Sequence, residues 1–307
     1  MVGRSRPRAS EPGASEPGAY RPRDLDEALA IRSRVPVIPF AGGTDLMVKM
    51  KNRGGLPPHF EKPALFIAHL EELGRIEPEG QIVKIGPACT LTALLESPHI
   101  PLPLKEAIAG IGSPAIRNAA TMGGNICNAS PAGDTLPVLY ALNASLVLAG
   151  RGARRVVPIE AFITAPGRTI LREDELVVSI RVPVRSFPLA AYRKVGTRRA
   201  NALAKLSFVA LAGIAQSELS ARRVRDLRIA LGAVAPTVVR SRVIEESMIG
   251  KTAFELSNLL DEVVGRYEDL INPIDDQRSS AAYRKAVSLR LVEHFLKQTL
   301  IPSLTDT

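Results

Sequence analysis

Apolar positions follow two different patterns along residues 20–185. Segments with a helical pattern occupy 24–34, where Asp24 is a suitable N-cap, and 44–50, 91–97, 102–111 and 134–142. Short apolar runs typical of strands occupy 35–40, 64–70, 82–87, 145–150 and 174–183. This alternation of strands and helices predicts an α+β or α/β fold.

The pattern changes after Pro183. Two long strand-like runs, 207–216 and 224–234, are suited to pair as antiparallel neighbours, and helical segments follow at 240–248, 253–264 and 279–300. The apolar face expected for the last helix consists of Ala282, Ala286, Leu289, Val292, Leu296 and Leu300. We therefore predict an α+β chain with a first domain at 20–185 and a smaller C-terminal domain at 189–302, an antiparallel sheet backed by helices.

Residues 1–19 differ from the rest, because the pentapeptide SEPGA occurs there twice in tandem among Pro, Gly and Arg. Such a segment has little apolar surface to bury, so we expect a disordered tail without a role in the fold. The whole chain has 307 residues, of which 46% are hydrophobic, and this length suits two globular domains.

Composition excludes several classes of protein. No apolar run reaches the roughly 18 residues that cross a bilayer, and the N-terminus lacks the apolar segment of a signal peptide, which makes the cytoplasm the expected location. Two cysteines and four scattered histidines do not supply a metal site. The net charge of +9 is accompanied by only 4% aromatic residues and no Trp, which argues against a nucleic-acid surface. A basic face that meets an acidic partner or a phosphate-bearing cofactor explains the charge as well.

The first motif with a chemical meaning is PFAGGTDL, residues 39–46. An apolar strand leads into two glycines and then into an expected helix start at Thr44 and Asp45. Glycines let backbone N–H groups approach an oxyanion, and a helix N-terminus adds partial positive charge. The motif is thus a candidate phosphate cradle; a tight strand–helix turn without a ligand is the alternative.

The second motif, ATMGGNICNASPAGD, covers residues 120–134. It combines another double glycine with many small polar residues, as expected where backbone presses against a flat ligand. Asp134 is placed to cap the next helix. A buried structural turn is the alternative for this motif alone, but two such loops are suited to hold a diphosphate-containing ligand from both sides.

The third motif, YRKVGTRRANALAK at 192–205, is basic. Among its cations are Lys194, Arg198, Arg199 and Lys205. It is either a solvated basic stretch or the source of one cation that stabilises a reduced flavin.

Together the three motifs resemble the medium, FAD-binding subunit of the xanthine dehydrogenase and carbon monoxide dehydrogenase family, from about Tyr20 to the C-terminus. The resemblance implies an FAD domain of the vanillyl-alcohol oxidase-like (PCMH-type) fold, followed by the family's smaller C-terminal domain. It places the first diphosphate loop at Phe40, Ala41, Gly42, Gly43, Thr44 and Asp45. It places the second loop at Thr121, Gly123, Gly124 and Asn125, and further FAD contacts at Asp134, Val177 and Lys194. Ile111 stands where some members place an aromatic residue over the flavin.

The resemblance also implies a function. FAD would be bound noncovalently, because neither loop has a His and attachment through Cys127 is not expected in this family. Electrons would arrive from 2Fe–2S clusters on a small partner subunit, after hydroxylation at a molybdopterin cofactor on a large subunit, and leave to NAD or another acceptor. No catalytic residue and no metal site are expected in this chain. The alternatives are a self-sufficient flavin oxidase of the same fold and a basic, non-catalytic interaction protein.

Overall fold

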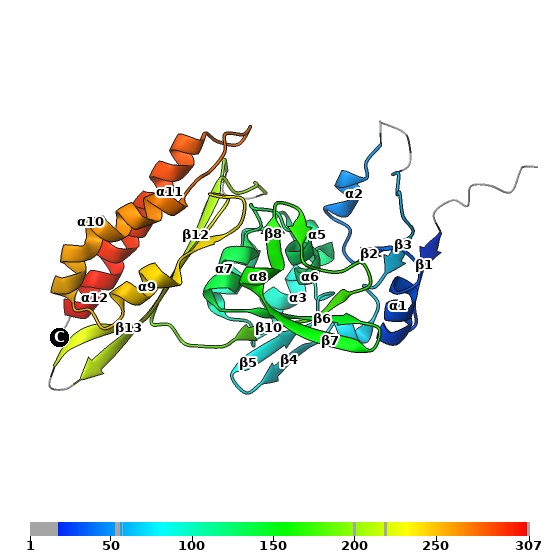
Figure 1. The fold of residues 1–307 in the computed structure, drawn as a ribbon, viewed down its shortest axis with the longest axis horizontal. Coiled ribbons are helices and arrows are strands. Elements are labelled where there is room, and N and C mark those ends of the chain that lie inside the picture. Colours follow the sequence, from blue (N-terminus) through cyan, green and yellow to red (C-terminus); the bar gives the residue numbers. More distant parts are fainter. Residues whose placement is uncertain (1–17, 53–55, 57, 199–200, 218–219, 306–307) are drawn as a thin grey trace, which may run out of the picture.

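The computed structural model describes residues 18–52, 56, 58–198, 201–217 and 220–305. Three parts follow one another along the long axis of the molecule: a small N-terminal unit, a central unit and a C-terminal unit (Figure 1). Residues 1–17 of the tail predicted at 1–19 lie outside the described residues. The end of that prediction was wrong, because Ala19 belongs to a short strand, β1 (Ala19–Tyr20), which pairs with β3 (Ala64–Phe66).

The N-terminal unit is a three-stranded parallel sheet in the order β1-β3-β2, with β2 at Ile38–Phe40. Helix α1 (Leu25–Arg32) has the predicted N-cap, because the Asp24 carboxylate accepts a hydrogen bond from the backbone N–H of Glu27 at 2.8 Å. Helix α2 is much shorter than the predicted 44–50, since it covers Leu46–Lys49 only. None of its residues is buried, so the helix has few packing contacts that could stabilise further turns.

The central unit is a five-stranded antiparallel sheet in the order β4-β5-β10-β6-β7. Its strands are β4 (Ile76–Glu79), β5 (Ile82–Ile85), β6 (Ser145–Gly150), β7 (Ala153–Pro158) and β10 (Leu176–Pro183). Strand β6 is apolar on both faces, because Leu146 and Leu148 pack with the central helices while Val147 and Ala149 pack towards α1. The sheet therefore separates two hydrophobic cores.

Short helices and one short ribbon complete the central unit. They are η1 (Glu71–Leu73), α3 (Leu91–Glu96), α4 (Leu102–Ala109), α5 (Pro114–Ala119), α6 (Met122–Cys127), α7 (Thr135–Ala141), α8 (Ile159–Phe162), and the pair β8 (Ile163–Ala165) and β9 (Arg168–Thr169). Every residue of α7 is buried, as expected from the uncharged sequence that surrounds it. Among the described residues, no helix is both long enough and apolar enough to cross a membrane.

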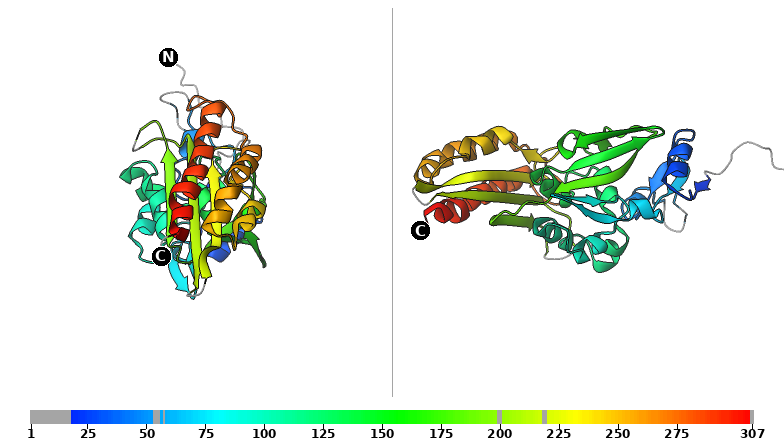
Figure 2. Two further views of the ribbon diagram at one scale, coloured as in Figure 1. Left: turned by 90° about the vertical axis from the view of Figure 1, so that its left-hand side faces the viewer. Right: turned by 90° about the horizontal axis from the view of Figure 1, so that it is seen from below.

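The C-terminal unit has the predicted antiparallel sheet backed by helices, so the expected α+β fold is confirmed. The sheet order is β11-β12-β13-β14, with bounds Leu189–Val195, Leu206–Ser217, Ser220–Gly232 and Val239–Arg240. Side chains alternate along β12: Phe208 and Ala210 pack under the helices, whereas Val209 and Leu211 join the core of the central unit. Figure 2 (left) shows the helices lying in front of the strands at this end. They are α9 (Arg242–Met248), α10 (Ala253–Leu270), α11 (Ala281–Phe295), a π-helical turn (Leu296–Leu300) and α12 (Ile301–Thr305).

The apolar face predicted for the last helix was partly wrong. Val292, Leu296 and Leu300 are buried as predicted, but Ala282 and Ala286 are exposed, and α11 buries Arg284 and Ser288 instead. The helix can bury Arg284 because the guanidinium forms an ion pair with Asp276, in the loop before α11. The buried face of α11 therefore differs from the predicted one, because Arg284 finds its ion-pair partner only in the folded chain.

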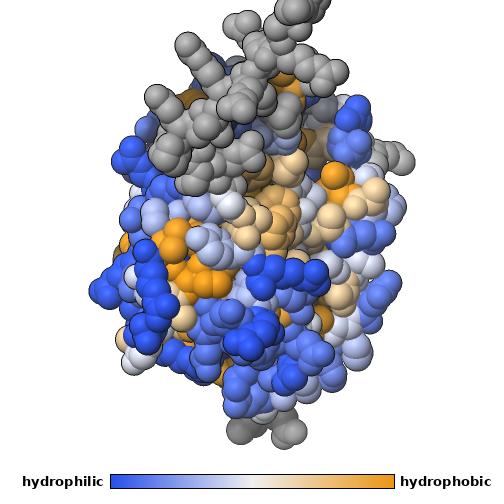
Figure 3. All heavy atoms as spheres, turned by 90° about the vertical axis from the view of Figure 1, so that its right-hand side faces the viewer, coloured by the Kyte–Doolittle hydropathy of each residue, from blue (hydrophilic) through white to orange (hydrophobic). Residues whose placement is uncertain are grey.

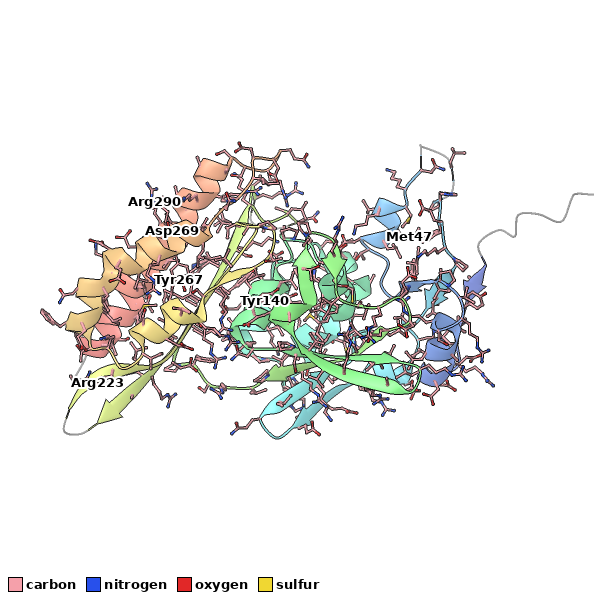
Figure 4. All side chains as sticks on the ribbon, viewed as in Figure 1. Met47, Tyr140, Arg223, Tyr267, Asp269 and Arg290 are labelled. Carbon is pink, nitrogen blue, oxygen red and sulfur yellow. The ribbon has the colours of Figure 1, made fainter. Side chains whose placement is uncertain are left out.

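Arginines from the C-terminal unit hold the end of α7. The Arg228 guanidinium donates to the carbonyl of Ala141 at 2.9 Å, and that of Arg240 donates to the carbonyl of Tyr140. These carbonyls lie at the C-terminus of α7, where cations are favourable. Figure 4 shows Tyr140 in the central unit, whereas Tyr267 lies among the C-terminal helices and Met47 on α2 at the opposite end. The contact fixes α7, and with it the segment of the second motif that leads into this helix.

Candidate functional site

A cavity of about 410 Å³ lies between the N-terminal unit and the central unit. That volume is within the roughly 300–1000 Å³ typical of ligand pockets. Most of the predicted site residues line it: Ala41, Gly42, Gly43, Thr44, Asp45, Ile111, Thr121, Gly123, Gly124, Asn125 and Val177. The remaining three, Phe40, Asp134 and Lys194, do not. The fold therefore brings the two glycine motifs together, although about 80 residues separate them in the chain.

The first glycine motif forms a tight turn after β2. Gly43 has a φ of +69°, a conformation that favours glycine. Gly42 allows a close approach, because a Cβ there would lie 2.0 Å from the carbonyl oxygen of Ala119, directly before the second motif. Within the described residues, the backbone N–H groups of Gly42, Gly43 and Thr44 donate no hydrogen bond to protein atoms. Three neighbouring donors on a pocket wall are suited to bind an anion.

The second glycine motif differs from the prediction, because its glycines lie inside helix α6 rather than in a loop. The helix begins after Thr121, whose hydroxyl accepts from the N–H of Gly124 at 3.1 Å. The N–H groups of Met122 and Gly123 donate to the carbonyls of Cys89 and Pro87. These donors are therefore already used. Gly123 packs against Pro87, since a Cβ there would lie 2.5 Å from the proline Cβ, whereas Gly124 is exposed to the pocket.

Polar side chains join the two motifs across the pocket. The Asn128 amide, just after α6, donates to the carboxylate of Asp45 at 2.8 Å. Its oxygen accepts a hydrogen bond from the ammonium of Lys49 on α2. Asn125 is held from behind, because its oxygen accepts from the hydroxyl of Thr135 at 2.6 Å. The first helix of the site, α2, is thus attached to the second motif through Asn128.

Asp134 does not cap α7 as predicted, because its side chain makes no capping hydrogen bond. It forms an ion pair with Lys194 at 2.7 Å, in which the two side chains are only 8% and 14% exposed. Burial raises the pKa of the Asp134 carboxyl above its ordinary value, although Lys194 opposes the shift. The Lys194 ammonium also donates to the carbonyl of Gly110 at 2.8 Å. The pair therefore lies behind the pocket wall, since Gly110 is the chain neighbour of the pocket residue Ile111. Lys194 is thus not an exposed surface charge.

The remaining walls are aliphatic. Their side chains are Ile67, Leu91, Ile111, Ile116, Leu171, Leu176 and Val177, and no described Phe or Tyr lines the pocket. The ring of Phe40 packs on Phe66 instead, with 5.1 Å between centroids. Figure 3 shows the end of the molecule that carries α2, where apolar and weakly polar residues gather between hydrophilic margins. Met47, Val48 and Phe66 are exposed apolar residues of this N-terminal unit.

The structure adds pocket residues that the sequence did not single out, notably Arg32 and Lys49. On short amphipathic helices such cations look like ordinary solvated residues, so no sequence signal identified them. Cys127 also lines the pocket, and desolvation raises the pKa of its thiol to about 12, although the charge of Arg32 opposes the shift. Within the described chain, no group of three His, Cys, Asp or Glu side chains is placed to hold a metal ion. Arg199 of the third motif lies outside the described residues.

Two protein families match the two halves of the chain. Residues 14–185 match the FAD binding domain in molybdopterin dehydrogenase, and residues 190–299 match the CO dehydrogenase flavoprotein C-terminal domain. The chain is 33% identical to the glyceraldehyde dehydrogenase medium chain of Sulfolobus acidocaldarius, over 87% of this chain and 92% of that one. It is 31% identical to the carbon monoxide dehydrogenase medium chain of Hydrogenophaga pseudoflava, over 90% and 94% of the two chains.

Solved structures are similar over the same length. A cyanide-inactivated Cu,Mo-CO dehydrogenase superposes with a TM-score of 0.78 at 26% identity, over 90% of this chain and 95% of that one. The carbon monoxide dehydrogenase of Hydrogenophaga pseudoflava that lacks the Mo-pyranopterin moiety gives 0.77 at 29% identity, over 90% and 94%. With the pocket geometry, these similarities identify the chain as a member of the family of FAD-binding medium subunits of molybdenum hydroxylases.

Proposed function

We propose that this chain holds FAD noncovalently in the pocket between the two glycine motifs and carries electrons through it. Electrons would come from 2Fe–2S clusters on a small partner subunit and leave to NAD or another acceptor. The observation that carries the proposal is the row of N–H groups at Gly42, Gly43 and Thr44, which have no acceptor in the described part of the chain. They lie on the wall of a cavity whose other walls are mostly aliphatic. A diphosphate needs the donors, and a flat ring system needs the aliphatic walls.

The pocket residues fit this cofactor in separate roles. The first motif offers donors for the diphosphate, while the exposed backbone of Gly124 and the side chains of Ile111 and Val177 offer surface for flat rings. When bound, FAD supplies the group that accepts and releases electrons. The chain contributes position and electrostatics, and we assign the electrostatic role to the buried Asp134–Lys194 pair behind Ile111.

Cys127 supports noncovalent binding. Cys127 lines the pocket, but desolvation raises the pKa of its thiol, which disfavours the thiolate. The thiolate, not the thiol, is the nucleophile in cysteine chemistry, so attachment to a flavin through this residue is disfavoured.

The partners and domain limits also belong to the proposal. The relatives are named as medium chains, and one solved relative is described by the Mo-pyranopterin moiety that it lacks. We infer a large molybdopterin-binding subunit and a small 2Fe–2S subunit for the complex. We also infer a flavin domain at 20–185, a C-terminal domain at 189–302, and a cytoplasmic location.

Purification of the native complex tests the proposal. We expect molybdenum, iron and FAD in one assembly, with the flavin bleached by a substrate drawn from carbon monoxide, aldehydes and purines, and recoloured by NAD or another acceptor. Acid precipitation should release the flavin as FAD. Flavin that stays in the pellet would contradict noncovalent binding, and flavin reduction without molybdenum and iron would favour the self-sufficient oxidase.

A further inference from the structure

Arg32 is the last residue of α1 and lies on the pocket wall, where it is half-buried. Two backbone carbonyls hold its guanidinium: Nε donates to the carbonyl of Glu175 and Nη1 donates to that of Val37 at 2.9 Å. The two acceptors come from different sides of the pocket, just before β10 and just before β2. The guanidinium is therefore positioned by backbone atoms before any ligand binds.

The charge of Arg32 has no close counter-ion within the described part of the chain. The arginines that are least exposed in ion pairs each have a carboxylate partner: Arg228 with Asp226, Arg240 with Glu245 and Arg284 with Asp276. Arg32 forms no such pair, and its surrounding acidic residues act only at longer range. Burial lowers the pKa of the guanidinium, but an arginine remains charged in proteins.

Most of the donors of Arg32 also have no acceptor among the residues that the structure describes. A guanidinium has five N–H donors, and the two backbone carbonyls use two of them. A half-buried cation with unused donors is costly unless something negative meets it. Because Arg32 lines the pocket, that group is expected to come from the ligand.

We propose that Arg32 supplies the counter-charge for the diphosphate of the bound FAD, an inference that rests on the proposed function of the pocket. The planar guanidinium suits phosphate oxygens, and the neutral N–H groups of the first motif do not balance the charge of a diphosphate. The other cation on the pocket wall, Lys49, lies on exposed α2 and already donates to Asn128. Arg32 thus binds the part of the cofactor that distinguishes FAD from riboflavin.

A purely structural role for Arg32 predicts a different result. Its two backbone hydrogen bonds also tie α1 to the segments before β2 and β10. Loss of that tie would weaken the pocket for every flavin alike. Loss of a phosphate contact would weaken it only for flavins that carry phosphate.

The test compares FAD with riboflavin on the full-length chain after flavin removal, by fluorescence titration. In Arg32→Gln the affinity for FAD should fall by about 10- to 100-fold, the range for a hydrogen bond to a charged group, while the affinity for riboflavin stays within about threefold. Arg34→Gln is the matched control, since Arg34 is exposed two residues further along and does not line the pocket. It makes the same change in net charge and should leave both affinities unchanged.

Equal losses for FAD and riboflavin, or no loss for either, would overturn the proposal. If Arg32→Gln does not fold, Arg32→Met keeps the aliphatic stem and carries the same expectation. Failure of the unmodified chain to bind FAD would instead refute the proposed function. If the wild-type chain binds FAD and the Arg32 variant binds it with the same affinity, only the inference about Arg32 is refuted.

Discussion

The two glycine motifs have similar sequences but different structures. In the first, the N–H groups of Gly42, Gly43 and Thr44 find no acceptor among the residues described by the structure, and the helix that follows has four residues, none of them buried. In the second, the glycines form the first turn of α6, and protein acceptors already take their N–H groups. The first motif therefore offers hydrogen-bond donors to a ligand, and the second offers shape.

The aspartates near the ends of the two motifs also differ in whether they face the pocket or the protein interior. Asp45 is exposed and accepts a hydrogen bond from Asn128 across the pocket. Asp134 is buried and paired with Lys194 from the C-terminal unit. The comparison teaches that a double glycine before an aspartate predicts a close approach of backbone, but not whether protein or ligand makes that approach.

The largest expected effect follows from breaking the buried pair at the second motif. Lys194→Met removes the partner of Asp134 and should lower the free energy of unfolding by about 3 to 5 kcal/mol near neutral pH, because a buried carboxylate is left unpaired. Urea unfolding of the full chain measures the loss. Lys297→Met, which removes an exposed lysine from an ion pair on the surface, should change it by less than about 1 kcal/mol.

The loss in Lys194→Met should depend on pH. Burial already raises the pKa of Asp134, and removal of the lysine raises that pKa further. Such a carboxyl takes up its proton at a higher pH in the folded state than in the unfolded chain. The variant therefore regains stability as the pH falls from the folded-state pKa towards the unfolded-state pKa of about 3.9. The destabilisation should therefore be smaller at acidic than at neutral pH. A loss that is independent of pH would show that Asp134 is not the group left unpaired.

A smaller effect is expected where the two motifs touch each other. Gly42→Ala places a Cβ where the carbonyl oxygen of Ala119 now lies, so the motifs must move apart. We expect a loss of about 1 to 3 kcal/mol in stability, together with weaker FAD binding. Gly265→Ala on α10 is the control, because its Cβ meets no atom within 4 Å, and it should be neutral or stabilising. Normal FAD binding in Gly42→Ala would mean that the contact between the motifs does not shape the site.

The smallest change in stability, with a clear change in binding, is expected at Gly124. Gly124→Val adds a side chain on the pocket side of α6, where its Cβ would lie 2.9 Å from Thr121 Oγ1, the hydroxyl that caps this helix. FAD content should fall at least tenfold, while the free energy of unfolding falls by about 1 kcal/mol because the cap must shift. Gly123→Ala should do the reverse, since its Cβ meets Pro87. Full flavin occupancy in Gly124→Val would place the cofactor away from α6.

Local patterns predicted most elements of the fold, because helical spacing and apolar runs depend on neighbouring residues. The helix after Asp24, the strand at 145–150 and the two long antiparallel strands of the C-terminal sheet are confirmed. Helix α6 was missed, because two adjacent glycines disfavour a helix in isolation. Its cap by Thr121 and the hydrogen bonds to Pro87 and Cys89 outweigh that preference in the folded chain.

By itself, the sequence determined which residue types are available for a diphosphate site: two double glycines, with small polar residues around the second. It also carried a family resemblance that covers nearly the whole chain. Only the tertiary structure decided which backbone donors have no acceptor and where Lys194 finds its partner. It also decided that Arg32 lies on the pocket wall with no carboxylate partner among the described residues. The reason is physical. The availability of a donor or a charge depends on what lies within a few ångströms of it, and those neighbours come from segments far away in the sequence.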